Sequence, residues 1–220
     1  MNVTAINMDR RTRGQSSILE LVGNTPLVKI NNITPHKEDV EIYAKLEWFN
    51  PGGSVKDRAA LGMIEDAEKA GALTKDKTII DSTSGNTGVA YSLVGAVKGY
   101  SVELVMPSNV TMERKRTIGA FKGKIVYSDP LEGSDGARLM ALQMLKDNPE
   151  KYYLPCQYDN ASNWKAHYQT TGVEIYHQTE GRVTHFVTGI GTGGTLMGVG
   201  KRLKDYDPSI QLTAVEPDNP

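Results

Sequence analysis

The chain has 220 residues, 39% of them hydrophobic, and a formal net charge of −1, which suits one large globular domain or two small ones. So small a net charge gives no electrostatic reason to expect binding to nucleic acid or to an anionic membrane. Cys156 is the single cysteine, which excludes an intramolecular disulfide and favours a reducing compartment, and no apolar run approaches the roughly 20 residues that cross a bilayer.

Residues 1–16 are polar and lack the apolar core of a secretory signal, so we expect a disordered tail there. Beyond the tail, strand-like and helix-like segments alternate. Short apolar segments rich in Val, Ile and Tyr predict strands at 41–48, 78–83, 101–107, 123–129, 151–158, 184–190 and 210–217. Apolar residues at helical spacing predict helices at 55–71, 88–99, 112–123, 136–148, 164–179 and 195–206. Helix C-caps are expected at Gly71, Gly99, Gly123 and Gly181.

This alternation predicts an α/β protein with mainly parallel sheets and helices on both faces. The sequence has no internal repeat and no low-complexity linker, so a second domain must be inserted into the first. Parallel sheets place their ligands at the carboxyl ends of strands. Three loops lie at such ends: NPGGSVKDR at 50–58, STSGNTG at 82–88 and GIGTGGT at 189–195.

The loop at 189–195 suits an anion, because its glycines let backbone N–H groups converge and the following helix adds its positive end. Its first six residues match the dinucleotide pattern G-x-G-x-x-G, and Glu216 stands 22 residues after the last of these glycines. A Walker A loop is excluded, because Thr195 and Arg202 occupy positions that need Gly and Ser or Thr. From this loop alone, a dinucleotide, another phosphate and a glycine turn without a ligand all remain open.

The loop at 82–88 surrounds Gly85 with more hydroxyl and amide side chains than helix capping requires, which favours a small carboxylate ligand. In the loop at 50–58, Lys56 follows two glycines and a serine at a strand-to-helix turn. Such a lysine is either a solvated surface charge or an amine that forms a Schiff base with an aldehyde cofactor. The combination of this lysine with a phosphate cradle and a carboxylate cradle favours the second interpretation. His167 and His185 have no partner at metal-ligand spacing, so no metal site is expected.

The three loops, in this order and at these separations, resemble the β-family of pyridoxal-phosphate (PLP) enzymes. Within that family the chain is similar to the cysteine synthases (O-acetylserine sulfhydrylases) and the cystathionine β-synthases. ELVGNTPLV at 20–28 and QYDNASNWKAHYQTTGVEI at 157–175 are similar as well, so the resemblance runs from about Ser17 to Pro220. It implies a two-domain fold of the tryptophan-synthase-β type with PLP as the cofactor. It also implies that the 189–195 loop binds the single phosphate of PLP.

The resemblance implies a domain for each part of the chain. A larger PLP-binding domain, incomplete in this sequence, would comprise residues 17–58 plus 162–220. A smaller α/β domain, residues 59–161, would be inserted into it and would close over the substrate. The family's pyridine-nitrogen partner lies in a C-terminal glycine-rich segment that this sequence lacks. We therefore expect a fragment truncated at the C-terminus or, as the alternative, a non-catalytic PLP-fold binding protein.

The resemblance also implies a role for each site residue. Lys56 would bind PLP covalently and move the substrate's Cα proton, and Asn86 would hydrogen-bond the ring hydroxyl. The phosphate would be bound by Gly191, Thr192, Gly193, Gly194 and Thr195. The substrate carboxylate would be bound by Thr83, Ser84, Gly85, Thr87 and Gln157.

The implied activity is β-replacement on an activated L-serine, either O-acetylserine or O-phosphoserine. A sulfur nucleophile would give L-cysteine through an aminoacrylate intermediate. Cystathionine β-synthase activity, which joins serine and homocysteine, is the alternative. We expect a cytoplasmic homodimer that acts on small molecules and has no metal, nucleic-acid or membrane partner.

Overall fold

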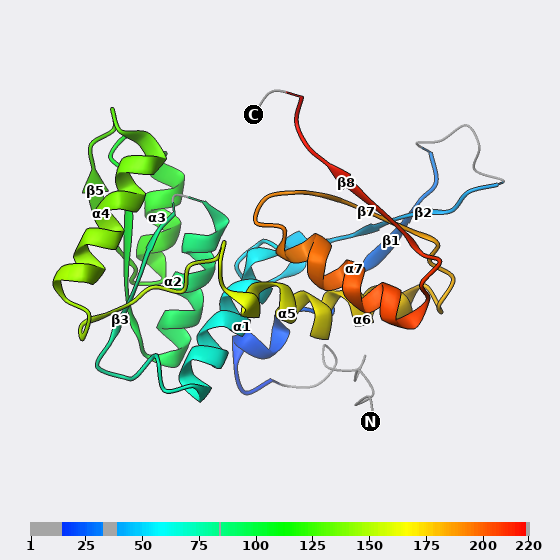
Figure 1. Ribbon diagram of the computed structural model, residues 1–220, viewed down its shortest axis with the longest axis horizontal. Helices are drawn as coiled ribbons and strands as arrows, with labels where there is room; N and C mark the ends of the chain where they lie inside the picture. Colours follow the sequence, from blue (N-terminus) through cyan, green and yellow to red (C-terminus); the bar gives the residue numbers. More distant parts are fainter. Residues whose placement is uncertain (1–14, 33–38, 84, 219–220) are drawn as a thin grey trace. The chain divides into compact units, whose positions relative to one another are not determined.

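The computed structural model describes residues 15–32, 39–83 and 85–218. The chain divides into two compact units, which we call the split unit (1–55 and 164–220) and the inserted unit (56–163). Figure 1 labels most of their helices and strands. The boundaries expected from the resemblance lie a few residues away from these bounds, with the result that Lys56 falls in the inserted unit.

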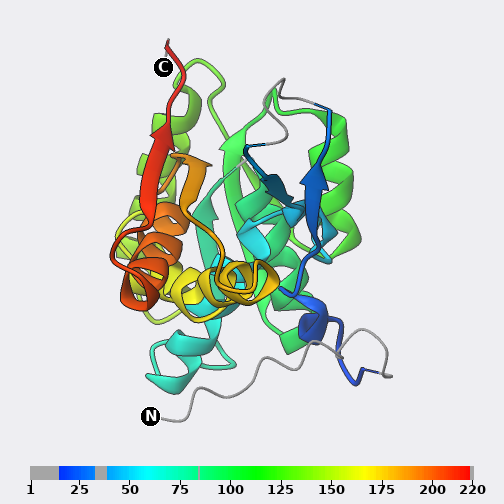
Figure 2. The ribbon, with the colours of Figure 1, turned by 90° about the vertical axis from the view of Figure 1, so that its right-hand side faces the viewer.

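The inserted unit is built on a parallel four-stranded sheet in the order β5-β4-β3-β6. Its strands are β3 (Thr78–Ser82), β4 (Ser101–Pro107), β5 (Lys124–Ser128) and β6 (Tyr152–Tyr153). Its helices are α1 (Lys56–Lys69), α2 (Asn86–Lys98), α3 (Met112–Ala120) and α4 (Gly133–Asp147). Parallel strands are joined by right-handed crossovers, so α2 and α3 cover one face of the sheet and α4, which returns the chain to β6, covers the other (Figure 2).

The core of the inserted unit lies between the sheet and the helices that cover its two faces. Strand β3 is buried at its first four positions, as a central strand of a parallel sheet must be. Ile80 and Val105 of the sheet pack against Ala137 and Ala141 of α4, together with Tyr152. The small alanines on α4 let the helix lie close to the strands.

Among its described residues, the split unit has two short sheets and three helices. Strands β1 (Leu27–Ile30) and β2 (Ile42–Lys45) are antiparallel, whereas β7 (His185–Gly189) and β8 (Gln211–Val215) are parallel. The helices are α5 (Ala161–Gln169), α6 (Thr171–Gln178) and α7 (Gly194–Tyr206), with the 3-10 turns η2 (Ile18–Leu21) and η3 (Glu47–Phe49). Helix α5 begins in the inserted unit. The core of the split unit is Ile175, Val199, Leu203 and Ile210.

Three sequence predictions of secondary structure were wrong in detail. Strand β1 was not predicted. The single helix expected at 164–179 is two helices, because the backbone of Thr170, with φ −120° and ψ −76°, departs from helical geometry. The strand expected at 151–158 shortens to β6, because Pro155 lacks an N–H and Cys156 turns the chain with a φ of 53°.

Three of the four predicted glycine caps adopt the left-handed conformation, namely Gly71, Gly99 and Gly181. The prediction for Gly123 was wrong, since Lys122 takes the left-handed position with a φ of 61°. Gly123 has a different reason to be glycine: a Cβ there would lie 2.6 Å from the Ser92 hydroxyl oxygen and 2.8 Å from the Ile118 side chain.

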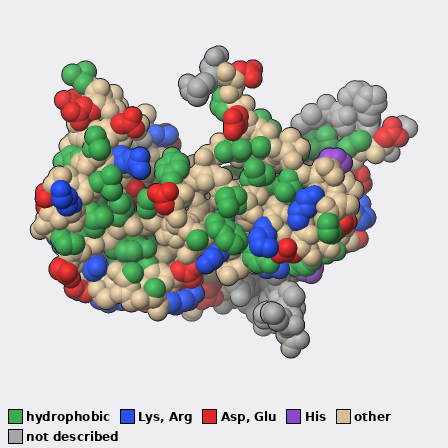
Figure 3. Space-filling view, in the orientation of Figure 1, with side chains coloured by type: hydrophobic (Ala, Val, Ile, Leu, Met, Phe, Trp, Pro, Cys, Tyr) green, Lys and Arg blue, Asp and Glu red, His purple; other side chains and the backbone are tan. Residues whose placement is uncertain are grey.

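On the face drawn in Figure 3, Lys and Arg side chains are interspersed with Asp and Glu side chains, in keeping with the near-zero net charge. Within the described ranges, none of the helices combines the length and the apolar character needed to span a membrane.

Candidate functional site

The inserted unit has a topological switch point at the carboxyl ends of β3 and β6. Strand β3 pairs with β4 on one side and with β6 on the other. The chain leaves β3 through α2 on one face of the sheet, and it reaches β6 from α4 on the opposite face. Open α/β sheets bind their ligands beyond the carboxyl ends of the strands at such a point. Thr83 and residues 85–87 follow β3, and Gln157 follows β6, so both segments lie at these strand ends.

Thr87 and Gln157, predicted to bind the same carboxylate, are brought together here. The Thr87 hydroxyl, on the first turn of α2, donates to the Gln157 side-chain oxygen at 2.9 Å. Asn163 holds Gln157 in place, since its side-chain amide donates to the Gln157 backbone carbonyl oxygen at 2.8 Å. Because the Thr87 hydroxyl occupies the side-chain oxygen of Gln157, the side-chain NH2 group is the part of this amide that can donate to an anion.

The remaining residues of this loop form the start of α2. Gly85 is the N-cap of the helix, and its N–H donates to the Thr83 hydroxyl at 3.3 Å. Asn86 is exposed on the first turn. A helix N-terminus presents backbone N–H groups and a positive partial charge, both of which favour a carboxylate. Ser84 lies outside the described residues, so its role stays a prediction.

Lys56 is the first residue of α1 and also belongs to the inserted unit. Its side chain is partly buried, and burial lowers the pKa of its ammonium group from the ordinary lysine value. A lowered pKa increases the fraction of neutral amine at physiological pH. Neutral lysine is the form that attacks an aldehyde and accepts a proton. The environment of Lys56 therefore suits both of its predicted roles.

The glycine-rich loop lies in the split unit, between β7 and α7. Gly193 is the N-cap of α7 and takes a left-handed φ of 78°, a conformation that favours glycine. A Cβ added at Gly191 or Gly193 would meet no atom within 4 Å, so the loop faces open space. The Gly194 N–H points to the Thr192 hydroxyl oxygen at 3.4 Å. Backbone N–H groups, two threonine hydroxyls and a helix N-terminus are the donor set that a phosphate group requires.

Thr195, on the first turn of α7, contacts a residue that was not predicted to belong to the site. Its hydroxyl oxygen lies 3.4 Å from Nε2 of His167 on α5. His167 is 2% exposed, and its Nδ1 lies 2.9 Å from the Thr171 hydroxyl. Asn163 and His167 both lie in the segment 157–175 that carries part of the resemblance, but their contacts are tertiary and leave no separate signal in the sequence.

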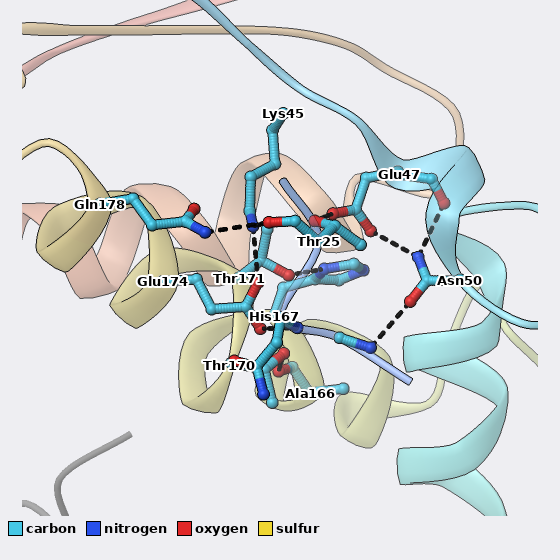
Figure 4. A network of polar contacts seen from close by, with 12 residues as sticks. Thr25, Lys45, Glu47, Asn50, Ala166, His167, Thr170, Thr171, Glu174 and Gln178 are labelled. Atoms are coloured by element: carbon cyan, nitrogen blue, oxygen red, sulfur yellow. Dashed lines mark hydrogen bonds and ion pairs between the residues drawn. The ribbon is translucent and has the colours of Figure 1, made fainter. Parts of the chain in front are cut away.

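A buried polar network ties the N-terminal part of the split unit to α6 (Figure 4). The Lys45 ammonium pairs with the Glu174 carboxylate at 2.7 Å, and the two side chains are only 10% and 4% exposed. Glu174 also accepts the N–H of Asn24 at 3.0 Å. Asn50, where the Lys56 loop begins, donates to the Glu47 carboxylate at 3.0 Å and accepts the Gly23 N–H at 2.8 Å. The network therefore anchors the first part of the loop that leads to Lys56.

Asp81 is the last residue but one of β3, two residues before Thr83. One of its carboxylate oxygens accepts the Ser82 N–H at 2.7 Å. The other is buried, as is the hydroxyl of Tyr91 on α2, and the two groups interact with one another without forming a well-aligned hydrogen bond. Burial raises the pKa of Asp81 to about 6 and, with the nearby Asp81 charge, raises that of Tyr91.

Replacing Asp81 with asparagine is expected to stabilise the protein at about pH 8 and not at about pH 4. Because the folded pKa of about 6 exceeds the ordinary aspartate pKa of 3.8, the folded state holds the proton more tightly, so stability is lost as pH rises through this window. The shift corresponds to ~3 kcal/mol. Urea denaturation of the wild type and the variant at both pH values measures the difference in their unfolding free energies. A difference in unfolding free energy that does not change with pH would contradict it.

A cavity of about 390 Å³ lies elsewhere in the split unit, between the β1–β2 hairpin and β7. Its lining is mainly apolar and includes Leu27, Ile42, Ile175 and Phe186. None of the predicted site residues lines it. Among the described residues, no group of three or more His, Cys, Asp or Glu side chains is placed to hold a metal ion.

The predicted site residues thus fall into two groups. Lys56, Thr83, Gly85, Asn86, Thr87 and Gln157 belong to the inserted unit, and residues 191–195 belong to the split unit. The structure joins Thr87 to Gln157 within the first group. In the second group it places the glycine-rich loop at the N-terminus of α7.

Comparison with known families gives one match that covers most of the chain. Residues 18–220 match the model of the family described as "Pyridoxal-phosphate dependent enzyme". A cysteine synthase from Aquifex aeolicus is 56% identical over 210 residues, which are 94% of this chain and 64% of the relative. A cystathionine beta-synthase from Apis mellifera is 43% identical over 212 residues, which are 94% of this chain and 42% of the relative.

Solved structures agree with these matches. The crystal structure of a cysteine synthase (OASS) from Entamoeba histolytica superimposes with a TM-score of 0.91 at 41% identity. The match covers 94% of this chain and 62% of that one. The chain therefore spans somewhat less than two thirds of the length of the cysteine synthases named here.

Proposed function

The chain belongs to the family of pyridoxal-phosphate dependent enzymes, and from this premise we propose that the protein makes L-cysteine by β-replacement. The substrate would be an activated L-serine, and the nucleophile would be a sulfur compound. The similarity to cysteine synthases supports this choice of substrate class. The observation that carries the proposal is the pairing of Thr87 with Gln157 at the switch point of the unit that also holds Lys56.

The residues present fit PLP. The open glycine-rich loop at the N-terminus of α7 has donors and space for the phosphate group. Lys56, whose pKa is lowered by burial, is suited to bond an aldehyde. Asn86, exposed on the first turn of α2, would hydrogen-bond the ring hydroxyl. When bound, PLP supplies an aldehyde that captures the substrate amine and a ring that takes up the electron pair of Cα.

The chain's own residues would bind and orient the substrate, move its Cα proton and exclude water. Thr83 would bind the substrate carboxylate through its hydroxyl and Gln157 through its amide NH2 group. Gly85 and Thr87 would add backbone N–H groups, while the Thr87 hydroxyl holds the Gln157 amide. This would orient Cα so that the Lys56 amine can remove its proton and later return it. Closing of the inserted unit over the substrate would exclude water while the β-leaving group departs and sulfur adds at Cβ.

The test is to supply the full-length protein with PLP and compare substrates. O-acetylserine, O-phosphoserine and serine are each added alone and then with sulfide or homocysteine. We expect O-acetylserine or O-phosphoserine alone to shift the visible absorbance, and sulfide then to give cysteine detectable by mass spectrometry. Product from serine and homocysteine only would favour the cystathionine β-synthase alternative. An absorbance that no amino acid changes would refute both activities.

Replacing Thr87 with valine is expected to weaken amino-acid binding by roughly 10- to 100-fold, because Gln157 loses the hydroxyl that engages its amide oxygen and holds its NH2 group toward the carboxylate. PLP content should stay unchanged. Absorbance titration with O-acetylserine measures the first quantity and cofactor release the second. Thr117→Val, which removes a hydroxyl from the exposed side of α3, is the matched control. Loss of PLP with unchanged amino-acid affinity would show that the two anion sites had been exchanged.

The proposed homodimer rests on the family resemblance, and the proposed cytoplasmic location rests on the resemblance and on the single cysteine. Size-exclusion chromatography of the full-length protein tests the homodimer.

A further inference from the structure

His167 joins two threonine hydroxyls that come from different helices. Nδ1 lies 2.9 Å from the Thr171 hydroxyl at the start of α6, and Nε2 lies 3.4 Å from the Thr195 hydroxyl at the start of α7. Thr171 and His167 are each 2% exposed, and Figure 4 shows them facing one another within the polar network. The histidine therefore links α6 to the glycine-rich loop through both ring nitrogens.

The protonation pattern of this chain of groups follows from what the loop is proposed to bind. A phosphate dianion only accepts hydrogen bonds, so Thr195 must donate its hydroxyl hydrogen to it. The Thr195 hydroxyl has one hydrogen, which cannot point at the phosphate and at the imidazole ring together. In its hydrogen bond with His167 the donor is then Nε2–H, and the Thr195 oxygen is the acceptor. In a neutral imidazole the other nitrogen is then an acceptor, and the Thr171 hydroxyl donates to it. The donors would run in one direction, from Thr171 through His167 to Thr195 and the phosphate.

The packing of α5 against α7 holds His167 within reach of Thr195. At Gly198, one turn along α7, an added Cβ would lie 2.1 Å from the Trp164 carbonyl oxygen and 2.6 Å from Cβ of His167. Only a residue without a side chain lets the two helices approach so closely at that point. Arg202, one further turn along, donates from Nε to the Tyr168 carbonyl oxygen at 2.9 Å. The helix that carries His167 is thus fixed at two places on the helix that carries Thr195.

We propose that His167 is a positioning residue for the cofactor phosphate, acting through Thr195. It holds the Thr195 oxygen as an acceptor, so that the hydroxyl hydrogen is directed at the phosphate. A chain of aligned hydrogen bonds is stronger than its separate members. The inference rests on the proposed function, because it takes PLP as the ligand of the glycine-rich loop.

The test compares two replacements of His167 in the full-length protein. Asparagine places its amide near the position of Nδ1, so it keeps the contact with Thr171 and loses the one with Thr195. Glutamine is longer and can place an NH2 group near the position of Nε2. We expect His167→Asn to weaken PLP binding about 3- to 10-fold, the loss of one hydrogen bond, and His167→Gln to restore most of it. Binding of pyridoxal, which lacks the phosphate, should be the same in all three proteins.

A second pair of variants shows whether the effect passes through Thr195. Thr195→Val should weaken PLP binding on its own, and adding His167→Asn to it should cause no further loss. Thermal unfolding of each PLP-free variant shows that it is folded. If His167→Asn does not fold, Thr171→Val is the substitute, since removing the hydroxyl that donates to Nδ1 should also weaken PLP binding and spare pyridoxal.

The outcomes separate this inference from the proposed function. A wild-type protein that does not bind PLP, or a Thr195→Val variant with unchanged PLP affinity, would overturn the assignment of the glycine-rich loop. If Thr195→Val weakens PLP binding while His167→Asn does not, the positioning role is wrong and the loop assignment stands. Equal losses for PLP and pyridoxal in His167→Asn would assign the residue a purely structural role.

Discussion

Replacing Lys56 with alanine is expected to lower the rate of cysteine formation by roughly 10²–10⁴-fold, the range seen when a positioned general acid–base is removed. The substitution removes the amine that would bond PLP and move the Cα proton. The glycine-rich loop is untouched, so PLP should still bind through its phosphate, with the absorbance of a free aldehyde in place of a Schiff base. Steady-state kinetics and a visible spectrum of the full-length variant measure both effects.

Lys69→Ala is the matched control for this experiment. Lys69 closes the same helix α1 with an exposed side chain and a weak surface ion pair to Asp66. Its removal should change neither turnover nor the spectrum. If Lys56→Ala were to turn over at the same rate as Lys69→Ala, Lys56 could not be the group that moves the proton.

Replacing Glu174 with alanine is expected to lower the free energy of unfolding by about 3–5 kcal/mol, as breaking one side of a buried ion pair does. The substitution takes the carboxylate away from the buried Lys45 ammonium and from the Asn24 N–H. Urea denaturation of the wild type and the variant measures the loss. Because the network also anchors the segment that leads to the Lys56 loop, we expect PLP content to fall as well.

Glu41→Ala gives the comparison for an exposed ion pair in the same unit. Glu41 bonds Arg182 at 2.7 Å, but the two side chains are 42% and 57% exposed, so solvent screens the interaction and the loss should be much smaller. The double variant Lys45→Met/Glu174→Leu should recover much of the stability lost in Glu174→Ala, since no unpaired charge is then buried. If Glu41→Ala and Glu174→Ala lowered the free energy of unfolding equally, burial would not govern the strength of the Lys45–Glu174 pair.

The regular parts of the fold were predictable where local pattern and tertiary environment agree. Strand β4 has the predicted bounds 101–107 because it is an apolar central strand of a sheet that helices cover on both faces. Strand β1 was missed because its sequence, LVKI, does not alternate between apolar and polar residues. In the structure its two middle residues, Val28 and Lys29, are both exposed. The break at Thr170 is a departure of one residue from helical φ and ψ, which the periodicity of apolar residues does not reveal.

The site was predictable to the extent that it is built from loops with unusual composition. The glycines of 189–195 and the hydroxyl-rich loop after β3 are visible in the sequence, and the family resemblance gave each residue a role. The contacts of Asn163, His167 and Asp81 were not predictable. Each depends on a neighbour from another element: Gln157 for the first, Thr195 for the second and the packing of α2 over β3 for the third. Such pairings exist only once the chain has folded.

Borohydride reduction of the full-length protein loaded with PLP tests the central claim most directly. Borohydride converts a Schiff base into a stable secondary amine, so the lysine that carried the cofactor keeps it through proteolysis and can be identified by mass spectrometry. We predict that the modified peptide contains Lys56 and that modification is lost in Lys56→Ala. A cofactor fixed to any other lysine, or a protein that yields no modified peptide after PLP loading, would contradict the assignment.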